Sequence, residues 1–182
     1  MNFTRVATSG LAVLALLAVT SACSTASNEQ RATPAPRATQ RTAVPATRAL
    51  ATPAYFAEAT AADLFLIRAA DIAIQRPGSR SRGTALQAKQ RHEGLAAQLA
   101  LAGRRLNLLP SRVLPAEYQQ MLAQLMSASD FDRAYVAQQR QVLGRTLKLH
   151  QAYARSGQSP TLRPVADFGA TTILTEIKRL GR

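Results

Sequence analysis

Histidine and carboxylate side chains are the first candidates for chemistry, and this chain has few of them at useful spacings. Its 182 residues include two histidines, His92 and His150. Glu93 follows His92 directly, but adjacent residues diverge around a helix, so the two cannot comfortably face one ion. The sequence has no Glu-x-x-His pair of the kind that builds di-metal sites in helical bundles. We therefore predict structural roles for both histidines and no metal or other cofactor, with His92 as a weak candidate ligand.

Patterns for nucleophilic catalysis and phosphate binding are also missing from the sequence. No serine stands in a Gly-x-Ser-x-Gly elbow, and no glycine-rich phosphate loop occurs. Asp130 and Asp132 are closely spaced acids, but their place at the start of a predicted helix explains them. We predict that the chain is not an enzyme.

Residues 1–22 have the pattern of an export signal. Arg5 precedes an apolar run over 11–19, and small residues follow it over 20–22. The run is too short to span a membrane, which takes about 20 residues. Cys23, the only cysteine, comes next, so a disulfide within the chain is excluded.

Cys23 resembles the cysteine that receives lipid in bacterial lipoproteins, although Thr20 stands where that pattern usually has Leu. Two outcomes remain open. Cys23 is lipidated, which together with Ser24 resembles lipoproteins on the periplasmic side of the outer membrane, or the chain is cut by the ordinary signal peptidase and secreted.

Residues 23–52 have the composition of a disordered linker. Alanine, threonine, proline and arginine dominate the segment, aromatic residues are absent, and Glu29 is the only acid. Such a segment has little apolar surface to bury, so we expect an extended tether. Its arginines could contact anionic lipid headgroups, or they could simply be solvated.

A strong positive charge is the main global feature. The chain has 23 Lys and Arg against 10 Asp and Glu, a net charge of +13; from Tyr55 onward there are 18 against 9, a net of +9. Six arginines stand in two groups near predicted helix ends: Arg76, Arg80 and Arg82, and Arg104, Arg105 and Arg112. They would suit an anionic lipid or envelope polymer, whereas the export signal disfavours nucleic acid. The alternative is a basic surface that follows from an Arg-rich composition alone.

Helical periodicity covers residues 53–182, and strand signals are absent from the sequence. We predict helices over about 53–76, 81–106, a short one from Pro115, 129–157, and one from Ser159–Pro160 to Leu180. Ser129 with Asp132 predicts a variant capping box, and Gly157 a left-handed helix end. Pro164 indicates a bend or a later start for the last helix.

Apolar and small residues recur at steps of three and four, which predicts the inward face of each helix. The predicted inward residues are Phe56, Thr60, Asp63, Ile67, Ala70 and Ile74; Ala85, Ala88, His92, Leu95, Leu99, Ala102 and Leu106; Tyr118, Met121, Leu122 and Leu125; Phe131, Tyr135, Gln138, Val142, Thr146, Leu149 and Tyr153; and Val165, Phe168, Ile173, Ile177 and Leu180. Four long helices and one short one favour an all-α, up-and-down four-helix bundle.

Three short stretches carry a family resemblance: FDRAY at 131–135, the Leu114–Pro115 pair, and AYARSG at 152–157. With them, the chain from about Phe56 to Leu180 resembles the family called "domain of unknown function 4142", bacterial envelope proteins regarded as ferritin-like helical bundles. The resemblance implies a ferritin-like fold and no particular activity.

The sequence departs from the family's polar positions. Leu66 stands near the place of a usual Glu, Arg91–His92 replaces Asp–His, Leu143 replaces a His, and a His is missing around Glu176 or Ile177. Of the set, His92 remains, and we expect it to hydrogen-bond Tyr135, Thr146 or a backbone carbonyl.

We therefore expect an exported, lipid-anchored, non-enzymatic structural or binding module. A ferritin-like metal-binding or redox protein is the first alternative, and an adaptor that binds anionic envelope material through its arginines is the second. Protein partners cannot be inferred from the sequence.

Overall fold

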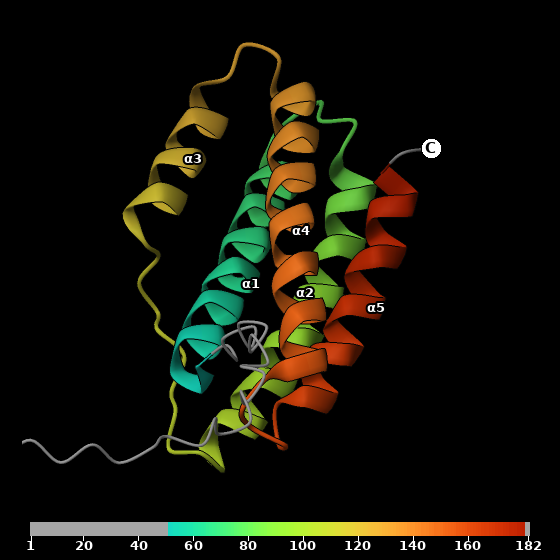
Figure 1. Cartoon of the computed structure of the whole chain (residues 1–182). Helices are drawn as coiled ribbons and strands as arrows, with labels where there is room; N and C mark the ends of the chain where they lie inside the picture. Colours follow the sequence, from blue (N-terminus) through green and yellow to red (C-terminus); the bar gives the residue numbers. More distant parts are fainter. Residues whose placement is uncertain (1–50, 181–182) are drawn as a thin grey trace, which may run out of the picture. The chain divides into compact units, whose positions relative to one another are not determined.

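The computed structural model describes residues 51–180, which form five α-helices and no strand (Figure 1). They are α1 (Thr52–Gln75), α2 (Arg82–Arg104), α3 (Ala116–Ser127), α4 (Phe131–Ser156) and α5 (Arg163–Leu180). The predicted all-α class and the presence of each helix are confirmed. The predictions for Cys23, residues 1–22 and nearly all of the linker lie outside the described residues.

The four long helices form a bundle in which every neighbouring pair is antiparallel. α1 packs mainly on α2 and α4 mainly on α5, while smaller contacts join α1 to α4 and α2 to α5. α3 lies beside α1 and α4 and returns the chain from the end of α2 to the other end of the bundle (Figure 1). Successive helices alternate in direction along the chain. Because α3 lies between them, α2 and α4 therefore run the same way.

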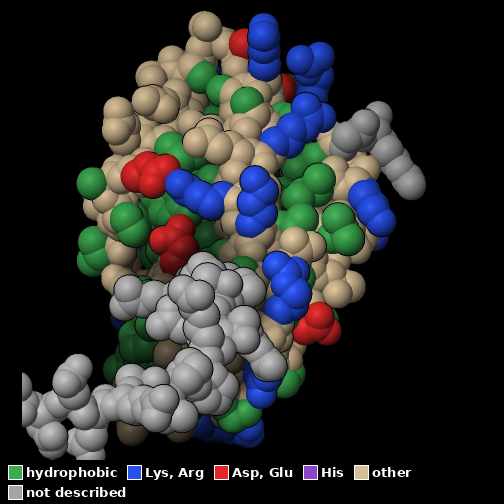
Figure 2. Space-filling model, in the orientation of Figure 1, with side chains coloured by type: hydrophobic (Ala, Val, Ile, Leu, Met, Phe, Trp, Pro, Cys, Tyr) green, Lys and Arg blue, Asp and Glu red, His purple; other side chains and the backbone are tan. Residues whose placement is uncertain are grey.

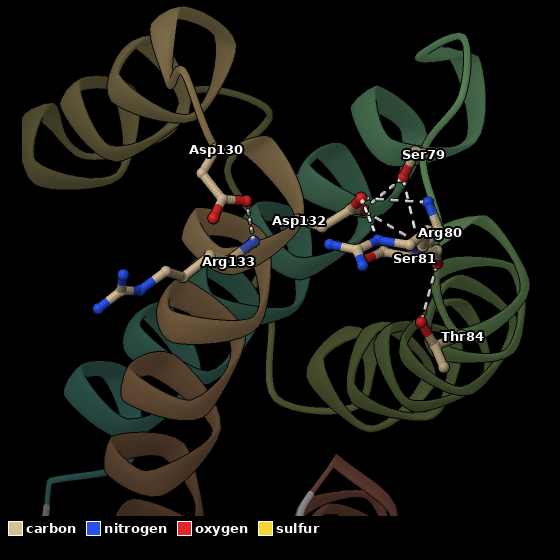
Figure 3. Close-up of polar contacts among 7 residues, drawn as sticks. All are labelled: Ser79, Arg80, Ser81, Thr84, Asp130, Asp132 and Arg133. Carbon is tan, nitrogen blue, oxygen red and sulfur yellow. Dashed lines mark hydrogen bonds and ion pairs between the residues drawn. The ribbon is translucent and has the colours of Figure 1, made fainter.

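Two predicted helix ends are wrong in detail. Asp130, not Ser129, caps α4: its side chain accepts a hydrogen bond from the backbone N–H of Arg133 at 3.2 Å (Figure 3). Gly157 follows α4 with φ −63°, in an extended rather than a left-handed conformation. The tight fit explains this glycine, because a Cβ there would lie 2.4 Å from the ring of Tyr153.

Asp132 joins α4 to the α1–α2 turn instead of completing a capping box. It accepts hydrogen bonds from the Ser79 hydroxyl at 2.8 Å, from the Ser81 N–H at 3.0 Å and from the Arg80 N–H at 3.2 Å (Figure 3). Hydrogen bonding from Ser81, first through its side chain, and from Ser79 and the Arg80 N–H lowers the pKa of Asp132. One carboxylate therefore satisfies the amides of the turn that leads into α2.

The last helix begins after Pro160, where the sequence predicted its start. Residues 160–162 form a turn in which the Ser159 hydroxyl accepts from the Leu162 N–H at 3.3 Å, and α5 starts at Arg163. Pro164 is then the second helical residue, where its missing N–H costs nothing.

The core contains most of the predicted inward residues. The α2 stripe from Ala85 to Ala102 and the whole predicted face of α3 are buried. On α4, Gln139 and His150 are buried, whereas Gln138 and Leu149 are only partly so. Phe168 is wrongly predicted, because 48% of its surface is exposed.

Small side chains let the helices approach closely. The buried alanines of α1 are Ala59, Ala61, Ala62, Ala69, Ala70 and Ala73. Gly103, near the end of α2, contacts the Phe56 ring so closely that a Cβ would lie 2.5 Å from it. The start of α1 and the end of α2 therefore lie together at one end of the bundle.

Candidate functional site

A chain of four ionisable side chains crosses the bundle from α1 through α2 to α5. His92 Nδ1 donates to Asp63 Oδ1 at 2.8 Å, and His92 Nε2 lies 3.3 Å from Glu176 Oε2. Arg91 Nε donates to the same Glu176 oxygen at 3.1 Å. Asp63 and His92 are fully buried and Glu176 nearly so. We call these four residues the ionic network.

The helix stripes place these groups. Asp63 lies on the buried face of α1. His92 is one residue of the α2 stripe of alternating small and large side chains, which faces α1. Glu176 follows Ile173 by three residues on the buried face of α5. Because Arg91 precedes His92 by one position, it emerges at the α2–α5 boundary and reaches Glu176 from the outside.

Each charge in the ionic network has an opposite neighbour. Burial alone lowers the pKa of His92, but hydrogen bonds and charges from Asp63 and Glu176 raise it to about 9. Burial also raises the pKa of Asp63 against the opposing pull of His92, while His92 and Arg91 outweigh burial and lower the pKa of Glu176. With His92 protonated between the carboxylates, two positive and two negative charges balance.

The prediction for His92 is half right. It is a buried structural histidine, but its partners are carboxylates and not Tyr135, Thr146 or a carbonyl, as we expected from the sequence. The sequence contains one signal for this contact. Asp63 lies on the predicted inward face of its helix, and a buried acid on an apolar stripe requires a partner. Glu176 gave no such signal.

The geometry of the ionic network does not suit a metal ion. The two nitrogens of the His92 ring point in opposite directions, one to each carboxylate, so one ion could not contact all three residues. Within residues 51–180, no group of three or more His, Cys, Asp or Glu is arranged to hold a metal. Leu66 and Leu143, at positions where the resembled family has polar groups, are fully buried in the core.

His150 forms a separate buried contact. Its Nδ1 lies 2.9 Å from the Tyr55 hydroxyl, and Tyr55 stacks on Tyr153 with ring centroids 3.7 Å apart. Burial, together with the charge of His92, lowers the pKa of His150 to about 4, so the ring is neutral at pH 7. Gly169 of α5 packs directly on this ring, and a Cβ there would lie 2.9 Å from it.

A small cavity lies beside Glu176. Its volume is about 30 Å³, and its lining includes Tyr135, Gln139 and Glu176. The Tyr135 hydroxyl and the Gln139 amide are buried without hydrogen-bond partners within residues 51–180. Such a cavity has room for a water molecule and enough polar groups to bind one.

An open groove runs along the boundary between α2 and α5. One part, of about 430 Å³, is lined by Gln90, Arg91, Gly94, Leu95, Gln98, Phe168, Thr171, Thr172, Thr175 and Arg179. It continues into a space of about 510 Å³ lined by Gln87, Gln90, Arg91 and Arg179. We call both parts together the α2–α5 groove. Its described lining has two arginines and no acidic residue.

The arginines of the first predicted group contact other residues at the end of the bundle where α1 ends and α2 begins. Arg76 lies over the Phe131 ring, 4.6 Å from its centroid, and donates to the Met126 carbonyl at 3.3 Å. Arg80 lies 3.6 Å from Asp132, and Arg82 donates to the Arg76 carbonyl at 3.3 Å (Figure 3 shows Arg80).

The arginines of the second predicted group are all exposed to solvent. Arg104 and Arg105 are exposed at the end of α2, and Arg112 lies in the following loop, where its carbonyl accepts from Arg68 at 3.1 Å. Figure 2 shows Lys and Arg side chains spread over one face of the molecule, with fewer Asp and Glu among them. Because the two groups lie toward different ends of α2, the structure does not bring all six arginines together.

No described helix combines the length and apolar character that crossing a membrane requires.

Comparisons with known proteins identify the chain's family. Searches of curated proteins and of solved structures returned no match. A family model described as "Domain of unknown function (DUF4142)" matches residues 35–179, most of the chain. With its helical bundle, the chain therefore belongs to this family of unknown function.

Proposed function

We propose that the protein is an exported, lipid-anchored and non-enzymatic binding module with a ferritin-like helical arrangement, whose arginine-rich surface contacts anionic material of the cell envelope. The observation that carries the proposal is the position of Arg104 and Arg105. Both directly follow Gly103, which packs on the first turn of α1, where the linker enters the bundle. A bundle anchored through that linker would carry these arginines at the end where the chain leaves for the membrane.

The ionic network supports a non-enzymatic role. A general acid or base needs an ionisable group within reach of a substrate. His92 and Asp63 are fully buried and already bonded to each other, and Glu176 already has two cationic neighbours. These groups join α1, α2 and α5 and have few free atoms to offer a substrate.

The crossover through α3 supports the ferritin-like arrangement.

Liposome binding tests the proposed surface. We expect Arg104→Gln/Arg105→Gln to bind vesicles containing phosphatidylglycerol less well than the parent chain, and binding to weaken steeply with salt, since exposed charges are screened within about 10 Å at 0.1 M. Arg133→Gln/Lys178→Gln is the control, because it removes the same charge from exposed positions at the other end of the bundle. Equal losses in the two variants would indicate a general effect of composition.

Mass spectrometry of the mature N-terminus tests the anchor. We expect a diacyl or triacyl group on Cys23 and release of the protein from membranes in Cys23→Ser. An unmodified N-terminus at or after Cys23 would favour plain secretion.

A ferritin-like metal protein is the second candidate, and it rests on the family resemblance rather than on the geometry of the ionic network. Metal analysis separates the two. Stoichiometric iron, manganese or zinc that survives dialysis and is lost in a folded Asp63→Asn/His92→Gln variant would replace the proposed function with a metal-dependent one.

A further inference from the structure

We propose that the α2–α5 groove is a binding site for a single-chain anionic lipid, with the acid group at Arg91 and Arg179 and the hydrocarbon chain along Phe168. The inference rests on the proposed binding function and gives it a ligand class and a place.

The two parts of the groove differ in character. Gln90 and the two arginines line both parts, whereas Phe168 and three threonines line the first part alone. Phe168 is a large apolar side chain of α5 that remains 48% exposed. A volume of about 430 Å³ is within the range of small-molecule sites, roughly 300–1,000 Å³.

The threonines of α5 add apolar rather than hydrogen-bonding surface. The Thr171 hydroxyl donates to the Asp167 carbonyl at 3.1 Å, and the Thr175 hydroxyl donates to the Thr171 carbonyl at 3.0 Å. The protons of these two hydroxyl groups are thus used within the helix and are not available to a ligand. This part of the groove suits a hydrocarbon chain better than a sugar or a peptide backbone.

Arg179 supplies net positive charge, and Arg91, whose charge Glu176 balances, supplies further hydrogen-bond donors. Arg91 is fixed through Nε by Glu176, and its terminal nitrogens have no partner within residues 51–180. Arg179 has no ion pair or hydrogen bond in the same range, and it lies beside Arg91 in the lining of the groove. Two guanidinium groups are well suited to a carboxylate or phosphate, which they can bind through paired hydrogen bonds.

Gly94 gives a direct way to block the site. A Cβ at Gly94 would meet nothing within 4 Å, so a larger side chain fits the fold but occupies the groove. Gly144, in the middle of α4, is equally open and lies outside the groove, which makes Gly144→Leu the matched control for Gly94→Leu. Arg155→Gln is the control for Arg179→Gln, because both residues are exposed in the last turn of a helix.

The test is calorimetric titration of decanoate into the full chain carrying Cys23→Ser, so that no acyl group of the protein competes. Circular dichroism establishes that each variant is folded. We expect saturable binding at one site, weakened about tenfold or more in Arg179→Gln, since a hydrogen bond to a charged group contributes on that scale. Gly94→Leu should abolish the binding, and both controls should retain it. Acetate, which lacks the chain, should not bind.

Two results would overturn the inference: no saturable binding by the parent chain, or equal binding by folded Gly94→Leu and Gly144→Leu. Neither would affect the liposome and Cys23 tests, which probe the arginines at the other end of α2 and the anchor. A parent chain that binds decanoate but does not bind the vesicles would instead reject the proposed surface and leave the groove as a separate site.

Discussion

The ionic network predicts that the protein loses stability as the pH rises from about 6.5 to about 9. His92 has an ordinary pKa of 6.5, raised to about 9 in the folded protein. A histidine with a raised pKa stabilises the fold fully below its unfolded value, and this contribution is lost as the pH rises through the folded value. At about 1.4 kcal/mol per pH unit, the interval corresponds to roughly 3 kcal/mol. That is a large part of the 5–15 kcal/mol typical of a domain.

Urea unfolding followed by circular dichroism at pH 6.5, 7.5, 8.5 and 9.5, at constant ionic strength, measures this loss. His92→Gln alone would leave Asp63 buried without a cation, at a cost of about 3–5 kcal/mol, and could prevent folding. The matched variant is therefore Asp63→Asn/His92→Gln, which puts a neutral amide pair in place of the charged pair. We expect its free energy of unfolding to be nearly flat over the same range. Stability that is constant in the parent chain, or that falls equally in both proteins, would refute a charged His92.

Three further predictions concern single positions. Because the pKa of His150 is lowered to about 4, its contribution is present above pH 6.5 and lost as the pH falls through 4, by roughly 3 kcal/mol; His150→Gln should reduce that acid dependence in urea unfolding. Gly169→Ala should lower the free energy of unfolding by about 1–3 kcal/mol, because its Cβ would press on the His150 ring, whereas Gly94→Ala should raise it by about 1 kcal/mol, as expected for open space on a helix. Asp132→Ala should cost about 1–3 kcal/mol and expose the 79–81 amides to hydrogen exchange, because three bonds to the α1–α2 turn are lost.

The sequence predicted the helices well because their periodicity is a local property. The α2 stripe, with its alternating small and large residues, was confirmed from Ala85 to Ala102. The face of α4 was partly misplaced, because Gln139 and His150 are buried at positions next to the predicted ones. Helix ends depend on a few contacts, so the cap fell on Asp130 instead of Ser129.

The ionic network could not be predicted in full, because it depends on the way distant helices pair. Asp63 and His92 are 29 residues apart, and Arg91 and Glu176 are 85 apart. Periodicity placed Asp63 and His92 on inward faces, but it could not show that these faces meet. The sequence marks Glu176 as one of four glutamates over residues 53–182 and as a place near which the resembled family has a histidine, but not as a partner of His92.

The position of α3 has a consequence for rearranging the chain. In a bundle of four helices joined by short turns the two ends of the chain meet, so circular permutation is simple. Here α3 adds a fifth pass, and α5 finishes at the opposite end from the start of α1 (Figure 1). The 18 residues of α5 span about 27 Å at 1.5 Å per residue. A permuted chain would need about eight or more extended residues to join Leu180 to Thr52, whereas a reporter fused beyond Leu180 would be displayed at the end far from Thr52.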